Sequence, residues 1–311
     1  MMASTGTQVD RSFAELLDSV AAGLLQDAQD ACLQDLAHEL HHRRSRLSPT
    51  GWRGVAAQVR SHPLHRALLQ SPITGRAFAK PRGYAGDAVL LDAIYGTGAR
   101  PLGVSTVGQA VYAFEYESRA SQSVRARRVR LAREIDGVAG RQAHARVLSL
   151  ACGHLREIEL SAAVREGRVS LSALDQDAAS VTRVERDYGS PAVTARVGTV
   201  LDAIRGRLPA NRFHLVYTAG LYDYLAADVA AALTASLFAC LEPGGQLLLA
   251  NFTPDFDCAA YLEACQDWNL IYRDEAEMVA MLHRIPGSAI ASCEQFREWT
   301  GAITYLRVRR R

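Results

Sequence analysis

The stretch Arg146-Val147-Leu148-Ser149-Leu150-Ala151-Cys152-Gly153 decides the fold of this chain. A short apolar run that ends in a glycine turn is typical of a strand buried on both faces. Similar runs recur along the second half of the chain, separated by helical patterns. Further strands are therefore expected at 169–174, 192–197, 213–217 and 246–251, the last one after the turn Glu242-Pro243-Gly244-Gly245.

Strands that alternate with helices form a parallel sheet that is covered on both faces. A helix is expected at 274–283, and two last strands at 289–294 and 302–309 would complete the sheet as an antiparallel pair. The predicted fold class is α/β, with a Rossmann-like, seven-stranded and mostly parallel sheet.

The first 135 residues have a different pattern, which predicts a helical N-terminal cap or lid. Apolar residues recur at helical spacing from Phe13 to Leu47, and a break follows at 48–51. Shorter helices are expected at 52–60, before Pro72 and before Tyr95-Gly96, and a long helix with many arginines at 112–135. The pattern predicts two domains, the cap at 1–135 and a Rossmann-like binding domain at 136–311.

Composition argues against several classes of protein. A formal net charge of +2 argues against nucleic acid as the main partner, because binding to phosphate backbones needs clustered basic charge. The six cysteines form no CxxC pair, and His38, His41 and His42 have helical spacing without a matching carboxylate, so no metal site is predicted. Neither a secretory signal nor a run of roughly 20 apolar residues is present, so a cytoplasmic protein without a membrane span is expected.

Ligands of an open parallel sheet bind at the carboxyl ends of its strands, where three features of this sequence lie. Gly153 follows the first strand and lets the backbone approach a ligand closely. Asp175 ends the second strand, at a spacing that suits a carboxylate on two ribose hydroxyls. Thr199 and Val200 follow the third strand, where an adenine could lie against a small apolar wall. Alone, Gly153 is compatible with a tight turn and Asp175 with a helix N-cap, but together the features favour a nucleoside site.

The stretch from about 146 to 309 resembles the class I fold of methyltransferases that use S-adenosylmethionine (SAM). Its turn at 151–155 has one glycine, whereas a dehydrogenase needs Gly-x-Gly-x-x-Gly to seat a pyrophosphate, which argues against NAD. The chain departs from the family at Ser149, where an acid often holds the methionine amino group, and at Leu155, where a further glycine is common. The resemblance implies SAM as a cosubstrate or as the sole substrate. The SAM contacts that it implies are Ala151, Gly153, Asp175, Gln176, Thr199, Val200, Ala219 and Gly220.

Since Ser149 is not an acid, another segment must hold the amino-acid end of SAM. The candidate is the loop Lys80-Pro81-Arg82-Gly83-Tyr84-Ala85-Gly86-Asp87. Arg82 could pair with the carboxylate of SAM and Asp87 with its ammonium, while Tyr84 could face the sulfonium. A surface turn with a satisfied salt bridge is the other interpretation of this loop.

This loop, together with 218–225 and 268–273, narrows the resemblance to a bacterial subgroup of class I enzymes with a helical N-terminal segment. The match runs from about Ala79 to the C-terminus. The subgroup includes enzymes proposed to make fatty-acid methyl esters. The size and layout of the chain are also similar to those of methyltransferase-like azetidine-2-carboxylate synthases, so the resemblance leaves the substrate open.

Polar and aromatic residues after the fourth and fifth strands are candidates for the reacting centre. The candidate catalytic residues are Tyr84, Tyr222 and Asn251, and the candidate substrate residues are Tyr224, Phe252 and Arg273. Either tyrosine after the fourth strand could instead pack under a helix, and Arg273 could cap one. His154 lies beside the glycine turn and is a candidate base, with a structural role as the alternative.

Three hypotheses about the use of SAM are compatible with these residues. In the first, a small-molecule carboxylate, amine or hydroxyl attacks the methyl group of SAM in line, and catalysis is mostly positioning. In the second, the α-amino group of SAM attacks its own γ-carbon and expels methylthioadenosine, which gives azetidine-2-carboxylate. In the third, the chain binds SAM without turnover. Methyl transfer in bacterial secondary metabolism ranks first, and a homodimer is a candidate assembly.

Overall fold

The computed structural model describes residues 7–26, 29–97, 104–209 and 212–311. The chain packs into two compact units, which are described separately. The helical unit contains 1–122 and 257–269, and the sheet unit contains 123–256 and 270–311. The domain boundary expected near residue 135 stays a prediction, although the contacts group 123–135 with the sheet.

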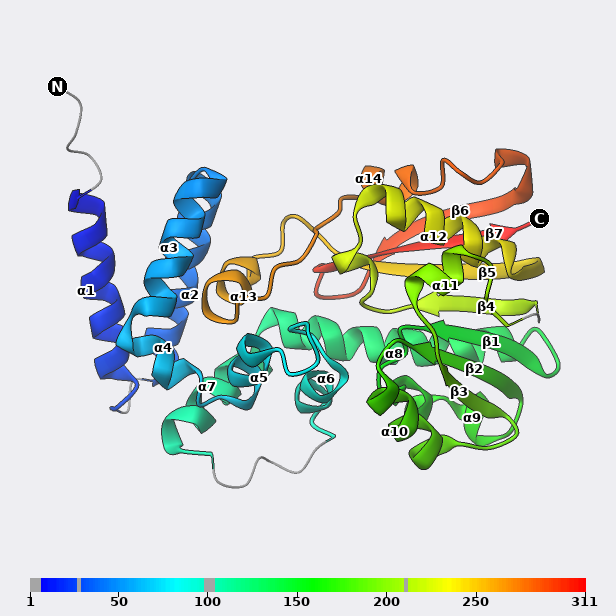
Figure 1. The fold of residues 1–311 in the computed structure, drawn as a ribbon, viewed down its shortest axis with the longest axis horizontal. Helices are drawn as coiled ribbons and strands as arrows, with labels where there is room; N and C mark the ends of the chain where they lie inside the picture. The colour runs from blue at the N-terminus through cyan, green and yellow to red at the C-terminus, as the bar shows by residue number, and fades with distance from the viewer. Residues whose placement is uncertain (1–6, 27–28, 98–103, 210–211) are drawn as a thin grey trace. The chain divides into compact units, whose positions relative to one another are not determined.

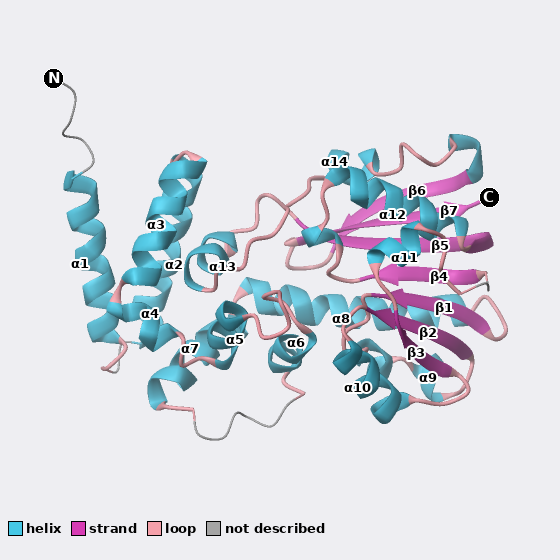
Figure 2. Ribbon diagram, viewed as in Figure 1, coloured by secondary structure: helices cyan, strands magenta, loops and turns pink. Residues whose placement is uncertain are grey.

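The sheet unit contains a seven-stranded sheet in the order β3-β2-β1-β4-β5-β7-β6 (Figure 2). Strands β1 to β5 are parallel, and β7 runs antiparallel to both of its neighbours, β5 and β6. This arrangement confirms the predicted fold class. The strands are β1 (Ala145–Leu150), β2 (Val169–Asp175), β3 (Val193–Val197), β4 (Phe213–Thr218), β5 (Leu241–Phe252), β6 (Ile290–Arg297) and β7 (Ile303–Arg310).

Helices cover both faces of this sheet, which explains why its central strands are apolar on both sides. On one face, α11 (Val200–Ile204), α12 (Ala227–Ala239) and α14 (Glu275–Ala280) share a core with the strands, in which Leu237 and Met278 meet Val216 and Leu247. The sheet unit also contains α9 (Ala162–Arg165) and α10 (Ala178–Tyr188). Helix α8 (Arg119–Ala139) binds the sheet through Glu134, which accepts a 3.0 Å hydrogen bond from Gln246 of β5.

The helical unit has its own apolar core, lined by Leu36 of α2, Trp52 and Val59 of α3 and Ala260 of α13. Helix α13 comes late in the chain but contacts α2 and α3 (Figure 1). There the carboxylate of Glu263 accepts from the Trp52 indole at 2.7 Å. The helices are α1 (Thr7–Gly23), α2 (Gln29–Arg46), α3 (Pro49–Ser61), α4 (Pro63–Leu68), α5 (Pro72–Ala79), α6 (Ala88–Tyr95), α7 (Thr106–Glu117) and α13 (Ala259–Cys265).

Two expectations about helices are corrected by the structure. The helical spacing from Phe13 to Leu47 belongs to two helices, because α1 ends at Gly23 and α2 begins at Gln29. The long helix expected at 112–135 is also divided, into α7 and α8. Ser118 divides it because its backbone is extended and its hydroxyl accepts from the amide of Ser121, as an N-cap does. No helix within the described ranges is long and apolar enough to cross a bilayer.

Candidate functional site

The turn after β1 is tied to the end of β2. The backbone amide of Gly153 donates to Oδ2 of Asp175 at 2.8 Å, and the amide of Asp177 donates to Oδ1 at 2.9 Å. Asp175 is 4% exposed, so these bonds form away from bulk solvent. The amide of Gly198, after β3, donates to the backbone oxygen of Asp175 at 2.9 Å. The turns after three adjacent strands therefore converge on one carboxylate-bearing residue.

The backbone of this turn is held in an unusual conformation. Ala151, Gly153 and Leu155 have φ values of 55°, 53° and 54°, in the left-handed region. Glycine adopts this region at no steric cost, whereas each L-residue with a side chain costs about 1–2 kcal/mol there. Two such residues within one short loop point to a shape that the surrounding contacts impose.

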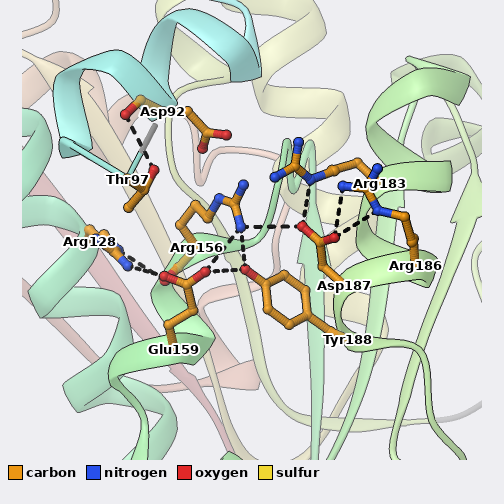
Figure 3. Close-up of polar contacts among 9 residues, drawn as sticks. All are labelled: Asp92, Thr97, Arg128, Arg156, Glu159, Arg183, Arg186, Asp187 and Tyr188. Carbon is orange, nitrogen blue, oxygen red and sulfur yellow. Dashed lines mark hydrogen bonds and ion pairs between the residues drawn. The ribbon is translucent and has the colours of Figure 1, made fainter. Parts of the chain in front are cut away.

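A network of ion pairs supplies part of that constraint (Figure 3). Nη1 of Arg156, in the short helix η1 (Arg156–Leu160), donates to Glu159 at 3.0 Å and to the Tyr188 hydroxyl at 2.7 Å. It also lies 3.4 Å from Asp187 of α10. Nε of Arg128 on α8 donates to the backbone oxygen of Arg156 at 2.9 Å. The segment after the glycine turn is thus fastened to two helices of the sheet unit.

The turn after β3 has a structural role that the sequence did not indicate. Thr199 is the N-cap of α11 and forms a capping box with Asp202, so its hydroxyl serves the helix start. A Cβ at Gly198 would lie 2.7 Å from Cδ2 of Leu174, which explains the glycine. Val197 and Leu201 expose 56% and 50% of their surface, and Val200 is partly buried. Apolar surface is therefore available beside the predicted nucleoside site.

A buried carboxyl that the sequence analysis missed lies at the carboxyl ends of β1 and β4. Oε1 of Glu157 accepts a 2.6 Å hydrogen bond from the Tyr217 hydroxyl. Burial raises the pKa of the Glu157 carboxyl, and the bond from Tyr217 opposes that shift. Tyr217 pairs across the sheet with Ser149, the position where the family often has an acid. Nothing in the local pattern of 153–157 distinguishes this glutamate from a surface residue of a helix.

A buried arginine, also missed, supports the loop after β4. Arg127 of α8 is 3% exposed, and its Nη1 donates to the backbone oxygen of Ala219 at 2.9 Å. A Cβ at Gly220 would lie 3.2 Å from the same nitrogen, so a side chain there would crowd the guanidinium. The predicted contact residues Ala219 and Gly220 therefore lie against a cation. Arg127 was hidden among the many arginines of its helix.

A third missed residue is Asp223, which joins the loop after β4 to the end of β5. Its Oδ1 accepts from the amide of Phe252 at 2.8 Å, and its backbone oxygen accepts from the amide of Ile271 at 2.7 Å. Burial raises the pKa of Asp223 to about 7, although the charges of Arg127 and Arg273 act in the opposite direction. This carboxyl therefore titrates near neutral pH.

Arg273 and Asn251 bind each other and the surrounding backbone. Nη1 of Arg273 donates to Oδ1 of Asn251 at 2.7 Å and to the backbone oxygen of Tyr222 at 2.6 Å, and Nη2 donates to that of Leu225. The side-chain Nδ2 of Asn251 donates to the backbone oxygens of Phe252 and Ile271 at 2.9 and 2.8 Å. These contacts give both residues a structural role, and their predicted roles toward a substrate stay predictions.

The aromatic candidates of the sheet unit differ in exposure. Tyr222 is fully buried, and its hydroxyl is 2.8 Å from that of Thr234 on α12, so it packs under that helix. Tyr224 is 37% exposed. Phe252 is 4% exposed, with its ring centroid 4.7 Å from that of Phe256. Of these three side chains, Tyr224 is the one with substantial exposed surface.

The 80–87 loop belongs to the helical unit, and Asp87 is its most constrained residue. Asp87 is fully buried and is the N-cap of α6, where Oδ1 accepts from the amides of Val89 and Leu90. The same oxygen accepts from Nε of Arg76 at 2.6 Å. Oδ2 makes no hydrogen bond within the described ranges. Arg82 and Tyr84 are half-buried, and the structure leaves their predicted roles untested.

The remaining candidates take varied positions. Gln176 is exposed after β2, and His154 is 5% exposed beside Gly153. The histidines of α2 are exposed, as expected for a solvated helix face. Within the described ranges, no group of three metal-binding side chains comes together.

Comparisons with known proteins find no matching family model and no matching curated protein. Among solved structures, the chain is similar to a possible exported protein from Bordetella parapertussis, at 16% identity and a TM-score of 0.59, over 85% of this chain and 99% of that one. It is also similar to magnesium protoporphyrin IX methyltransferase from Synechocystis PCC 6803 with bound S-adenosylhomocysteine (SAH), at 15% identity and a TM-score of 0.49. The match covers 76% of this chain and 98% of that one. A third is the N-methyltransferase NodS from Bradyrhizobium japonicum WM9, at 14% identity and a TM-score of 0.41, over 59% and 96%. At these identities, similarity extends to the fold alone.

Proposed function

We propose that this chain binds SAM at the carboxyl ends of β1 to β4 and transfers its methyl group to a small molecule. The observation that carries the proposal is the bond between the Gly153 amide and Asp175, in a turn with left-handed backbone. A carboxylate offers about four acceptor sites, so Asp175 can hold the turn and also accept from ribose hydroxyls. The turn has one glycine and no phosphate cradle, which favours a nucleoside without phosphates.

The acceptor is a small-molecule carboxylate, amine or hydroxyl of bacterial secondary metabolism. Its lone pair attacks the methyl carbon in line, the bond from that carbon to sulfur breaks, and SAH leaves as the neutral thioether. A carboxylate acceptor needs no base, whereas an amine or hydroxyl also gives up a proton to a base. Asn251 and Tyr222 belong to the end of β5 and the loop after β4, where we place the reacting centre. A role of Tyr84, which lies in the helical unit, stays a prediction from the sequence alone. We assign acceptor contacts to Tyr224, Phe252 and Arg273. A homodimer remains our prediction for the assembly.

Cyclisation of SAM is the second candidate, and the buried carboxyls favour it. The α-amine must be neutral to attack the γ-carbon, so its ammonium must first lose a proton. Burial raises the pKa of both Glu157 and Asp223, so each is a stronger proton acceptor than an ordinary carboxylate, and the pKa of Asp223 is about 7. Attack then breaks the bond from the γ-carbon to sulfur and releases methylthioadenosine with azetidine-2-carboxylate.

Incubation of the purified protein with SAM alone, followed by mass spectrometry, separates these reactions. Because SAM decomposes slowly by itself, the control is an equal incubation without protein. Azetidine-2-carboxylate above the control would establish cyclisation. Intact SAM, followed by SAH once carboxylate, amine and hydroxyl acceptors are added, would establish methyl transfer. Binding of SAH without either product would leave a SAM-binding protein without turnover, and no binding of SAM or SAH would refute the proposal.

A further inference from the structure

Arg127 is a buried cation with unmet donors. Its guanidinium forms no ion pair within the described ranges, and its one hydrogen bond there goes from Nη1 to the backbone oxygen of Ala219. Nε is buried and makes no hydrogen bond within the same ranges. A buried guanidinium normally has its donors satisfied, because an unmet donor loses its bonds to water without replacement. An anion at this position would accept hydrogen bonds from the unmet donors of Arg127.

Glu157 is a buried carboxyl near the same strand end. Glu157 is 7% exposed, and its carboxyl accepts a hydrogen bond from the Tyr217 hydroxyl. Tyr217 and Ala219 are two residues apart, so Glu157 and Arg127 both lie at the carboxyl end of β4. Burial raises the pKa of Glu157, and the charges of Arg128 and Arg127 act in the opposite direction, toward the ionised form. The carboxyl of Glu157 could accept hydrogen bonds from a cation with N–H donors, and the guanidinium of Arg127 could donate to an anion.

The place of this pair in the sheet is where a ligand is expected. The strand order reverses between β1 and β4, which are adjacent although they are not consecutive in the chain. Open α/β sheets bind ligands outside the carboxyl ends of strands at such a switch point. The turn that carries Gly153 follows β1, and the loop on Arg127 follows β4. The pair therefore lies beside the proposed nucleoside site and within the same unit.

We propose that Arg127 and Glu157 bind the α-amino-acid end of the ligand, with Arg127 on its carboxylate and Glu157 on its ammonium. This inference rests on the proposed function and names residues of the sheet unit for a role that the sequence suggested for the 80–87 loop. Asp87 of that loop already caps α6 and pairs with Arg76.

Charge balance favours a zwitterion over a phosphate at this pair. One cation and one anion have no net charge, and an α-amino acid adds none. A phosphate would bring two negative charges to a site where Arg127 also faces the carboxyl of Asp223. Burying uncompensated charge is costly, so the amino acid is the ligand class that the pair fits.

The test compares two ligands that share a nucleoside and differ at the amino-acid end. SAH carries the α-amino acid, and methylthioadenosine does not. The dissociation constants of both are measured by calorimetry for the parent protein and for Arg127→Met and Glu157→Gln. Arg130→Met is the matched control, because Arg130 lies on the same helix but pairs with Glu134 and packs over Phe296.

We expect the parent to bind SAH more tightly than methylthioadenosine. Each of the two variants should weaken SAH by about 10- to 100-fold, the usual effect of losing a charge-assisted bond, and leave methylthioadenosine within about twofold. Arg130→Met should leave both constants unchanged. Glu157→Gln keeps the size of the side chain and its bond from Tyr217, so it remains informative if Arg127→Met fails to fold.

Each other outcome overturns a stated part of the argument. If the parent binds methylthioadenosine and SAH equally, or if the variants weaken both ligands alike, the pair does not bind the amino-acid end, while nucleoside binding stands. If the parent binds neither ligand, the proposed function itself fails.

Discussion

The amide of Gly153 donates a 2.8 Å hydrogen bond to the carboxylate of Asp175, 22 residues later in the chain. This bond joins the turn after β1 to the last residue of β2. The carboxylate therefore has a structural task in the free protein, before any ligand arrives. A change at Asp175 should alter the shape of the turn and the affinity for a nucleoside together.

Asp175→Asn tests this double role. The amide side chain has one acceptor and one donor, so one of the two backbone N–H groups now facing the carboxylate would face a donor. We expect the dissociation constant of SAH to rise at least tenfold, about 1.4 kcal/mol. The free energy of unfolding, from urea titration, should fall by about 1–3 kcal/mol because a buried donor is left unsatisfied.

Asp177→Asn is the matched control for that variant. Asp177 is the N-cap of α10, and asparagine caps a helix as well as aspartate does. Stability and SAH binding should both stay close to those of the parent. Parental SAH affinity in Asp175→Asn would remove this carboxylate from the ligand site.

Ala151→Gly tests the strain in the same turn. Ala151 has a φ of 55°, which costs an L-residue about 1–2 kcal/mol and glycine nothing. Glycine also gains freedom in the unfolded chain, which offsets about 0.4–1 kcal/mol. The free energy of unfolding should therefore rise by up to about 1.5 kcal/mol in urea titration.

Leu155→Gly provides the contrast, because its φ is 54° but its side chain is 1% exposed. Loss of a buried leucine side chain costs about 2–5 kcal/mol, more than the strain that is relieved. This variant should be less stable than the parent. A loss of stability in Ala151→Gly as well would show that the left-handed backbone at 151 is not strained.

The sheet was predictable because buried strands are short apolar runs with turns at both ends. β1 to β4 begin and end within about two residues of the expected ranges. The helical breaks were harder to predict, since the helical spacing of the sequence continues from α1 to α2, and at Ser118 a single hydroxyl ends α7. The packing of α13 on α2 and α3 depends on pairs such as Glu263 with Trp52, more than 200 residues apart, which local patterns do not contain.

The sequence allowed the convergence of two segments to be predicted where backbone geometry sets the residue type, and their role toward a ligand stays a prediction. The glycine turn and the acid after β2 are of this kind, and the structure joins them. Arg127 and Glu157 were missed because their importance comes from burial at one strand end. In the sequence, each resembles the charged residues that face solvent on an ordinary helix. Conversely, the sequence suggested Asp87 as a ligand-binding residue, and its buried position as the N-cap of α6 is a structural reason for an aspartate there.

Asp87 provides a prediction for the helical unit. Asp87→Ala removes the N-cap of α6 and leaves Arg76 without its partner, so the free energy of unfolding should fall by about 1–2 kcal/mol. Asp87→Asn keeps a capping oxygen and should lose less. Thermal melting of both variants measures the difference. Equal melting temperatures for Asp87→Ala and the parent would show that the cap contributes nothing to this unit.

The raised pKa of Asp223 predicts a pH dependence of stability. In the unfolded chain this carboxyl ionises near pH 4, whereas in the folded protein burial raises its pKa to about 7. Between these values the folded state holds a proton that the unfolded state has released. The contribution of Asp223 to stability is therefore present below about pH 4 and is lost as the pH rises through about 7.

Asp223→Asn does not titrate, and its side-chain oxygen can still accept from the amide of Phe252. Its free energy of unfolding relative to the parent should therefore increase as the pH rises from about 5 to about 8, because only the parent must then bury a charge. Asp202→Asn is the control, because the fold lowers the pKa of Asp202. This carboxyl is therefore ionised in both the folded and the unfolded protein throughout that range. Urea titrations at several pH values measure both differences. We expect the free energy of unfolding of the control, relative to the parent, to stay constant over this range. If that of Asp223→Asn stays constant as well, Asp223 is already ionised in the folded protein at about pH 5. The charges of Arg127 and Arg273 would then compensate its burial fully.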